Sequence, residues 1–257
     1  MTTLYGGTPS QGVPIGILMV DSVLPRIPGD VGNGFTYDFP VRFYTVKGAK
    51  AKNIVEGGDP ALLQPFIDGA KALEAEGCQA ISTCCGFLIA FQKQLSEAVH
   101  IPVITSGLLQ VPMVASMLPP DQKIGILTAN DTTLNPKYFA ENVPVERLCI
   151  QGMQETEHFY KTFPLNAPSY VYEEVEADVA WAARKLKSEH PDIGAIVCEG
   201  TNFAPFNPMV CRLTGVPVFD VVTLIRWAAS GILRGYTSPF RNQLTGGPML
   251  GVYERPM

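Results

Sequence analysis

The chain has 257 residues, of which 46% are hydrophobic and only 17% are charged, and its formal net charge is −5. This composition is typical of one large globular domain or two small lobes with a sizeable core. The acidic balance argues against nucleic acid as a partner, and no apolar run reaches the roughly 20 residues that span a bilayer. Residues 1–12 are polar and lack the pattern of a signal peptide, so we expect no membrane partner and a cytoplasmic location.

Short apolar runs alternate with amphipathic stretches along the chain. The predicted strands are rich in Val and Ile, as buried parallel strands are, and cover 13–20, 78–83, 102–105, 123–128, 145–151, 193–198 and 217–219. The predicted helices show apolar spacings of three and four and cover 60–76, 88–99, 108–117, 131–141, 173–190 and 221–234. This alternation predicts α/β architecture with parallel sheets.

Two regions depart from the alternation. Residues 25–43 contain the turn signals Pro-Gly-Asp and Gly-Asn-Gly, and a loop of this length in a compact chain is usually functional or a lid. Residues 159–172 carry two prolines and are predicted to form an irregular connection.

An internal repeat relates two halves of the chain. The aligned segments are 15–18 with 124–127, 80–86 with 195–201, and 101–104 with 216–219. The repeat predicts two pseudo-symmetric lobes, each with a mainly parallel sheet flanked by helices. We place the first lobe at residues 1–106 plus 222–257 and the second at residues 107–221. Ligands of open α/β sheets bind beyond the carboxyl ends of the strands, so we expect the active site in the cleft between the lobes.

Cys85 closes a predicted strand of the first half, and its counterpart in the repeat is Gly200. A thiol at a helix N-terminus has its thiolate favoured by the helix dipole, and the free N–H groups at Gly86 can hold a carboxylate. The alternative is that Cys84 and Cys85 are two small buried residues in a tight turn. A thiol on one wall and a glycine on the other predict a one-sided acid/base or nucleophilic site.

The other five cysteines are weaker candidates for the catalytic thiol than Cys85. Successive strand residues point to opposite faces, so Cys85 is chosen as the catalytic thiol and Cys84 is kept as a substrate contact. Cys198 lies on the same face as Gly200 but deeper, and it is a second candidate acid. Buried, inert thiols are expected at Cys78, Cys149 and Cys211.

Small polar residues follow several predicted strands. Thr201 and Asn202 follow Gly200, and their hydroxyl, amide and backbone N–H groups suit a carboxylate as well as helix capping. The same argument applies with less force to Thr128 and Ser106. Asp21 and Ser22 follow the first predicted strand and border the same expected cleft, although Asp21 could instead cap a turn. Arg26 and Arg42 flank the loop at 25–43, where either could pair with a carboxylate, although surface solvation is the simpler interpretation.

Motifs for bound cofactors are missing from the sequence. No dinucleotide fingerprint follows a strand, there is no P-loop, and the three histidines lack ligand spacing. We therefore predict chemistry without a cofactor or a metal.

These residues together resemble the aspartate/glutamate racemase superfamily, which includes amino-acid and hydantoin racemases, maleate isomerase and arylmalonate decarboxylase. The resemblance covers nearly the whole chain and is carried by residues 16–18, 27–33, 39–42, 85–88, 106–112, 125–128 and 199–202. It implies two pseudo-symmetric α/β lobes with the active site between them. It also implies substrate contacts by Asn33, together with Asp21, Ser22, Thr128, Thr201 and Asn202.

The resemblance also bears on the mechanism. Racemases of this type place one cysteine on each wall. Cys85 matches the first of these, and Gly200 stands where the second would be. Arylmalonate decarboxylase uses a single cysteine to protonate one face of an enediolate, so this chain is similar to it with the lobes exchanged.

The leading hypothesis is a cofactor-independent racemase or isomerase that acts at the carbon α to the carboxylate of a small acid or amino-acid derivative, with Cys85 as proton donor or base. One alternative is a lyase, such as a decarboxylase, with one-faced protonation by Cys85. A second is covalent addition of Cys85 to an unsaturated acid, and a third is a non-catalytic small-acid binding protein. The expected partners are a small carboxylate substrate and further copies of the chain in a homo-oligomer.

Overall fold

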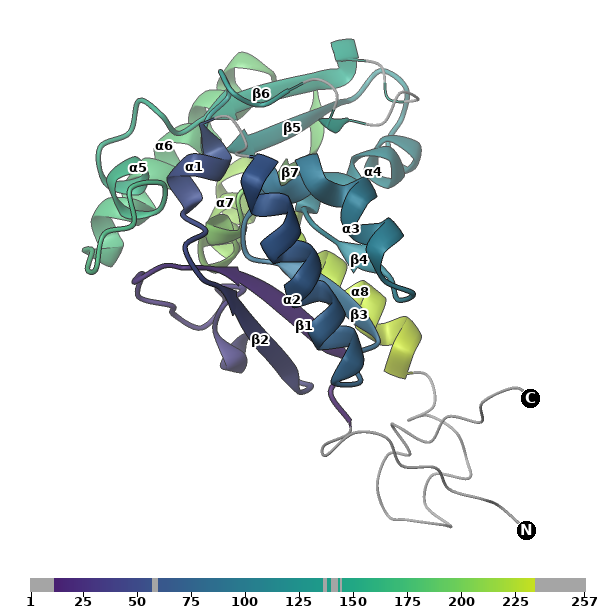
Figure 1. Cartoon of the computed structure of the whole chain (residues 1–257). Helices are drawn as coiled ribbons and strands as arrows, with labels where there is room; N and C mark the ends of the chain where they lie inside the picture. Colours follow the sequence, from purple (N-terminus) through teal and green to yellow (C-terminus); the bar gives the residue numbers. More distant parts are fainter. Residues whose placement is uncertain (1–11, 57–59, 136–137, 140–142, 144, 234–257) are drawn as a thin grey trace.

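The computed structural model of the chain describes residues 12–56, 60–135, 138–139, 143 and 145–233. Within these residues, eight strands form two four-stranded sheets, and every strand pairing is parallel. The first sheet has the order β2-β1-β3-β4 and the second has the order β6-β5-β7-β8 (Figure 1). The α/β class with two parallel sheets is thus confirmed.

The strand order is the same in both sheets, so the internal repeat of the sequence is also a repeat of the structure. The first sheet consists of β1 (Ile15–Val20), β2 (Val41–Val46), β3 (Ala80–Thr83) and β4 (Val103–Ile104). The second sheet consists of β5 (Lys123–Thr128), β6 (Leu148–Gly152), β7 (Ile193–Cys198) and β8 (Val218–Phe219). In particular, β3 and β7 hold equivalent central positions in the two lobes.

Helices connect and cover the strands. The α-helices are α1 (Ala51–Val55), α2 (Leu63–Ala75), α3 (Gln92–Ala98), α4 (Val111–Met117), α5 (His158–Thr162), α6 (Tyr172–Glu189), α7 (Asn207–Thr214) and α8 (Val221–Ile232). The 3-10 helices are η1 (Gly34–Thr36), η2 (Pro60–Leu62), η3 (Gly86–Phe91), η4 (Gly107–Gln110), η6 (Val145–Arg147) and η7 (Thr201–Phe206). Among the described residues, no helix is both long and apolar enough to cross a membrane.

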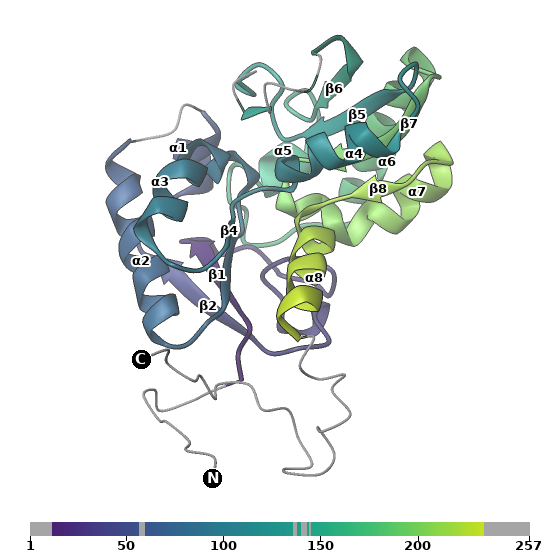
Figure 2. The same cartoon turned by 90° about the vertical axis from the view of Figure 1, so that its right-hand side faces the viewer.

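The lobes exchange one helix each. Helix α4 follows the last strand of the first sheet but packs on β5 of the second sheet. Helix α8 follows the last strand of the second sheet but packs on β3 and β4, opposite α2 and α3 (Figure 2). Residues 234–257, which the sequence assigns to the first lobe, lie outside the described part of the chain. The lobe boundaries themselves stay a prediction.

Close packing explains part of the repeated sequence. A Cβ atom at Gly16 in β1 would lie 2.9 Å from Leu73 of α2. A Cβ atom at Gly125 in β5 would lie 2.9 Å from Leu186 of α6. Both glycines let a helix lie directly on its sheet, and a larger residue would overpack the core at roughly 1–3 kcal/mol.

Some sequence-based expectations are wrong. The edge strand β2 overlaps the end of the predicted loop 25–43 and was missed, because its side chains are only partly buried and show no continuous apolar run. The helix expected at 131–141 is not formed at residues 131–135, where residues 131–133 make a turn. The connection at 159–172 contains most of α5, and Cys211 on α7 is exposed rather than buried. Asp59, the residue before the predicted helix at 60–76, lies outside the described residues.

Candidate active site

Two turns from the two lobes pack directly against each other. Cys85 is the N-cap residue of η3, after β3, and Gly200 is the N-cap residue of η7, after β7. The Thr201 hydroxyl donates a hydrogen bond to the backbone oxygen of Cys84, over 2.6 Å. A Cβ atom at Gly86 would lie 1.9 Å from the backbone oxygen of Glu199, so only glycine permits this approach. The two strand ends that the repeat pairs therefore meet.

A cavity of about 30 Å³ lies between these turns, which is room for roughly one water molecule. It lies at the carboxyl ends of the central strands of both sheets, where open α/β sheets bind ligands. Its wall includes six residues predicted from the sequence, which are Cys84, Cys85, Gly86, Gly200, Thr201 and Asn202. Those six residues come from both lobes, which supports the cleft between the lobes as the site.

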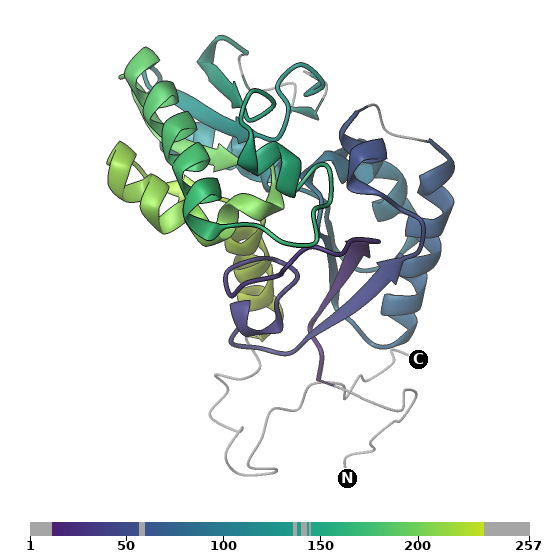
Figure 3. The ribbon, with the colours of Figure 1, turned by 90° about the vertical axis from the view of Figure 1, so that its left-hand side faces the viewer.

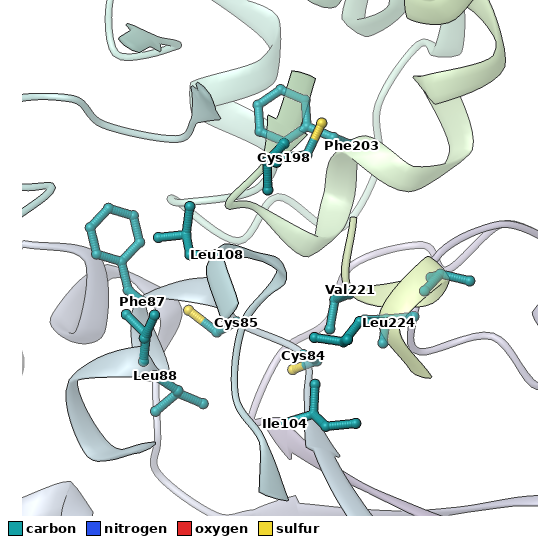
Figure 4. Packing of buried hydrophobic residues seen from close by; sticks show 14 of the residues in the cluster. Cys84, Cys85, Phe87, Leu88, Ile104, Leu108, Cys198, Phe203, Val221 and Leu224 are labelled. Carbon is teal, nitrogen blue, oxygen red and sulfur yellow. The ribbon is translucent and has the colours of Figure 1, made fainter. Parts of the chain in front are cut away.

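Cys84 and Cys85 both contribute to the cavity wall, but in different surroundings (Figure 4). The sulfur of Cys84 accepts a hydrogen bond from the backbone N–H of Val20, over 3.0 Å. Burial raises the pKa of Cys84, and the nearby Arg26 guanidinium partly offsets that rise. Burial, and then the charge of Glu199, raise the pKa of Cys85 well above its usual range. Both groups are therefore protonated thiols at neutral pH.

Glu199 is the acidic side chain of the cavity wall, and sequence reasoning gave it no role. Its side chain is buried, and its Oε2 accepts hydrogen bonds from the Thr128 hydroxyl at 2.9 Å and the Ala129 N–H at 3.3 Å. Burial raises its pKa to about 7. The available signal was a carboxyl residue directly after a fully apolar strand, because such a residue is rarely buried without a reason.

The loop after β1 supplies a buried ion pair to the same site. Arg26 lines the cavity and donates to the Asp30 carboxylate at 3.0 Å and to the Ser22 hydroxyl at 3.0 Å. The Asn202 amide of the second lobe donates to the other Asp30 oxygen at 3.0 Å. The Asn33 amide donates to the backbone oxygen of Arg26 at 2.7 Å. Arg26 is thus held in the cavity wall. The simpler interpretation from the sequence, that Arg26 is solvated at the surface, is wrong.

An aromatic wall completes the cavity. Phe159 and Phe163 both line it, and their rings meet edge to face with centroids 4.8 Å apart. The segment after α5 that carries Phe163 runs beside the loop after β1 (Figure 3), where the Val23 N–H donates to the Asn166 side chain at 2.9 Å. These aromatic residues come from a connection that the sequence marks only as irregular.

Two predicted contacts lie one layer behind the cavity wall. Thr128 reaches the site through Glu199. Ser22 reaches it through Arg26. Neither of them is among the residues that line the cavity.

Three other predicted residues have local partners away from the cavity. The Asp21 carboxylate pairs with Lys50 at the surface. The Ser106 hydroxyl caps η4. The Cys198 thiol donates to the Asn207 side chain at 3.3 Å and lies beside Phe203, apart from Cys85 (Figure 4). This placement does not support Cys198 as a second acid. Among the described residues, no three His, Cys, Asp or Glu side chains gather as metal ligands would.

Comparison with known proteins identifies the family. Over 230 residues the chain is 30% identical to a dimethylsulfoniopropionate lyase of Durusdinium sp. clade D, which covers 86% of this chain and 74% of that protein. It is 27% identical to dimethylsulfoniopropionate lyase 7 of Emiliania huxleyi, over 81% of this chain and 64% of that protein. The chain belongs to the family of these lyases. No protein-family model matches it.

Solved structures show the fold that this lyase family member adopts. Unliganded arylmalonate decarboxylase superposes with a TM-score of 0.54 at 18% identity, over 87% of this chain and 94% of that one. Allantoin racemase from Pseudomonas fluorescens superposes with a TM-score of 0.56 at 16% identity, over 91% and 97% of the two chains. The two-lobe α/β fold that the resemblance to the aspartate/glutamate racemase superfamily implies is thereby confirmed.

Membership in the lyase family changes the balance between the functional hypotheses. The sequence favoured an isomerase and kept a lyase as the alternative, whereas the relatives above are named as lyases. The chain spans about three quarters of the Durusdinium protein and smaller parts of several Emiliania huxleyi relatives, down to 45% of one of them. The lyase alternative is therefore the better supported hypothesis.

Proposed function

We propose that this protein is a cofactor-independent lyase that removes a proton from the carbon α to a carboxylate and expels a leaving group from the neighbouring β carbon. The observation that carries the proposal is the one-sided thiol, Cys85, opposite Gly200. Racemisation needs a proton donor on the face opposite the base. Elimination needs only the base, because the electron pair of the broken C–H bond forms the new double bond and expels the leaving group.

The named substrate of the relatives fits this reaction, and we propose dimethylsulfoniopropionate as the substrate here. Its sulfonium group is attached to the carbon β to the carboxylate. Loss of the α proton and cleavage of the C–S bond yield acrylate and neutral dimethyl sulfide. The sulfur keeps the electron pair of the broken bond, so the leaving group needs no proton.

The cavity offers partners for both charges of such a zwitterion. Arg26 is the cationic side chain of the wall and suits the carboxylate. The rings of Phe159 and Phe163 suit the sulfonium cation through cation–π attraction, which contributes about 0.5–2 kcal/mol. A cavity of about 30 Å³ must expand for this molecule to enter.

Proton removal beside a carboxylate also requires stabilisation of the resulting negative charge. The backbone N–H groups of Phe87 and Leu88 lie at the turn after Cys85, where they lower the pKa of that thiol. Donors that are fixed in advance stabilise a developing anion more than mobile water does. We propose that these N–H groups, together with Arg26, hold the substrate carboxylate and its enediolate form.

The test is NMR detection of acrylate from dimethylsulfoniopropionate by the purified chain. We expect wild-type protein to release acrylate and Cys85→Ala to lower kcat by at least about 10²-fold. Cys198→Ala examines the second candidate acid and should retain activity, as should Cys149→Ala, the control for loss of a buried thiol elsewhere. Acrylate release by Cys85→Ala at the wild-type rate would refute the role of this thiol. No release by wild-type protein would refute the substrate.

The homo-oligomer also remains part of the proposal. Large apolar side chains are exposed on helices of both lobes, including Trp227 on α8 and Met117 on α4. Light scattering on purified protein will give the mass of the assembly, and a monomer would contradict this part.

A further inference from the structure

One buried oxygen of the site has no hydrogen-bond partner. Within the described part of the chain, the Oε1 atom of Glu199 is the buried side-chain nitrogen or oxygen that lacks a partner. Its sister atom, Oε2, is held by Thr128 and Ala129. Leaving a buried polar atom unpaired costs about 1–3 kcal/mol, so such an atom in a native protein calls for a functional explanation.

The unpaired oxygen lies against the turn that carries Cys85. A Cβ atom built on Gly86, the residue after Cys85, would be 2.3 Å from Oε1. Glu199 and Cys85 both line the cavity, and the charge of Glu199 is the second largest influence on the pKa of Cys85. The carboxyl of one lobe and the thiol of the other therefore form a neighbouring pair.

Other groups near Glu199 leave this pairing intact. Among the described residues, no cation contributes to the pKa of Glu199, which reflects burial against the hydrogen bonds from Thr128 and Ala129. The remaining titratable neighbours that respond to its charge are Cys198 behind it and Tyr138. The pKa of each is raised, so both remain protonated in the neutral range. Arg26 lies in the same cavity wall but pairs with Asp30.

We propose that Glu199 and Cys85 form a proton-sharing pair, in which Glu199 takes the thiol proton as the sulfur of Cys85 removes the α proton of the substrate. The original S–H bond of Cys85 breaks, and its proton forms an O–H bond at Oε1 of Glu199. A new S–H bond then forms between Cys85 and the former α proton of the substrate. The electrons of the substrate C–H bond form the double bond and expel the leaving group. Glu199 then releases its proton to water. The substrate step of this inference rests on the proposed function. The pairing of Glu199 with Cys85 does not.

The pair has a pH signature that either group alone lacks. Two adjacent buried groups cannot both be negative, so above pH 7 the pair holds a single proton. Thiolate then arises by moving that proton onto Glu199, which does not depend on pH. Thiolate at Cys85 should therefore increase up to about pH 7 and then level off. Without the carboxyl group, it should continue to increase tenfold for each pH step of one.

The variant Glu199→Gln isolates this effect and should fold. Its amide oxygen can accept the hydrogen bonds from Thr128 and Ala129, while its amide nitrogen occupies the position of Oε1. The control is Glu155→Gln, which removes a carboxyl group from an exposed turn. The reagent is methyl methanethiosulfonate, and tandem mass spectrometry assigns modification to Cys85 rather than Cys84.

We expect wild-type protein and Glu199→Gln to be modified at Cys85 at equal rates at pH 6. At pH 8 the variant should react about tenfold faster, since its thiolate continues to increase by a factor of ten for each pH step of one. The Glu155→Gln control should follow wild-type protein throughout. Equal rates in wild-type protein and Glu199→Gln at both pH values, including no modification in either, would overturn the pair.

Turnover of dimethylsulfoniopropionate gives a second measurement. We expect kcat/KM of wild-type protein to level off above about pH 7, and kcat/KM of Glu199→Gln to continue to increase tenfold for each pH step of one, so that the variant is about tenfold faster at pH 8. Glu199→Asp, which retains a carboxyl group, should restore the plateau. A plateau of kcat/KM above pH 7 in Glu199→Gln would overturn the pair. A pair seen by thiol modification in a protein that does not turn over this substrate would refute the substrate and leave the pair standing.

Discussion

Replacing Glu199 by Gln should stabilise the protein at alkaline pH and leave its stability at acidic pH nearly unchanged. The pKa of this carboxyl group rises from 4.5 to about 7 on folding, because burial disfavours its charged form. A group with a raised folded-state pKa contributes stability that is fully present below pH 4.5 and is lost as the pH rises through 7. The rise of about 2.5 in pKa corresponds to about 3 kcal/mol of stability lost by pH 8. Glutamine has no proton to lose and escapes this loss.

Urea unfolding of wild-type protein and Glu199→Gln at pH 5, 6, 7 and 8 measures the effect. The difference in unfolding free energy between the two proteins should grow by about 2.5 kcal/mol in favour of the variant between pH 5 and pH 8. Other titrating groups contribute equally to both proteins and cancel. Glu155→Gln, at an exposed turn, should give a curve parallel to wild type. Parallel curves for Glu199→Gln as well would refute the assignment of a buried, perturbed carboxyl group.

Two further substitutions examine the contact between the lobes. Gly86→Ala should destabilise the protein by at least about 1–3 kcal/mol and abolish activity, because its Cβ would lie 1.9 Å from the backbone oxygen of Glu199. The control Gly34→Ala, whose Cβ would have nothing within 4 Å, should match wild type in thermal unfolding. Thr201→Val removes the donor to the Cys84 carbonyl and should cost about 1–3 kcal/mol in urea unfolding, whereas Thr201→Ser should keep most of the stability. Wild-type stability of Gly86→Ala or Thr201→Val would contradict the packing described.

The fold was largely predictable because its core strands are buried on both faces. The predicted strands at 123–128 and 193–198 match β5 and β7 at both ends, since continuous apolar runs bounded by polar residues mark them. The edge strand β2 was missed because an edge strand pairs on one side only and its sequence carries a weaker apolar signal. The internal repeat of the sequence predicted that the two sheets are equivalent, which hydrophobic periodicity alone does not show.

The site was predictable only in part. The repeat brings the ends of β3 and β7 to attention, so Cys85 and Gly200 follow from alignment alone. Glu199 was missed because a residue between a strand and a turn is usually assigned a structural role only. Its burial also depends on contact with the other lobe, which the sequence does not show. The aromatic wall was missed because Phe159 and Phe163 reach the cavity from a connection without periodicity.

The two strand ends differ in a way that favours a one-directional reaction. In the repeat, Cys85 aligns with Gly200, and Cys84 aligns with Glu199. The second wall therefore has a carboxyl group displaced by one residue from the place where a second thiol would stand. Like groups facing each other can give and take a proton equally, as reversible inversion at carbon requires. An unlike pair with a carboxyl group of pKa about 7 draws the proton toward oxygen and then to water, while Gly200 offers no side chain to return a proton from the other face. An elimination that releases a neutral leaving group needs no such return, and for this reason the asymmetry of the site agrees with a lyase.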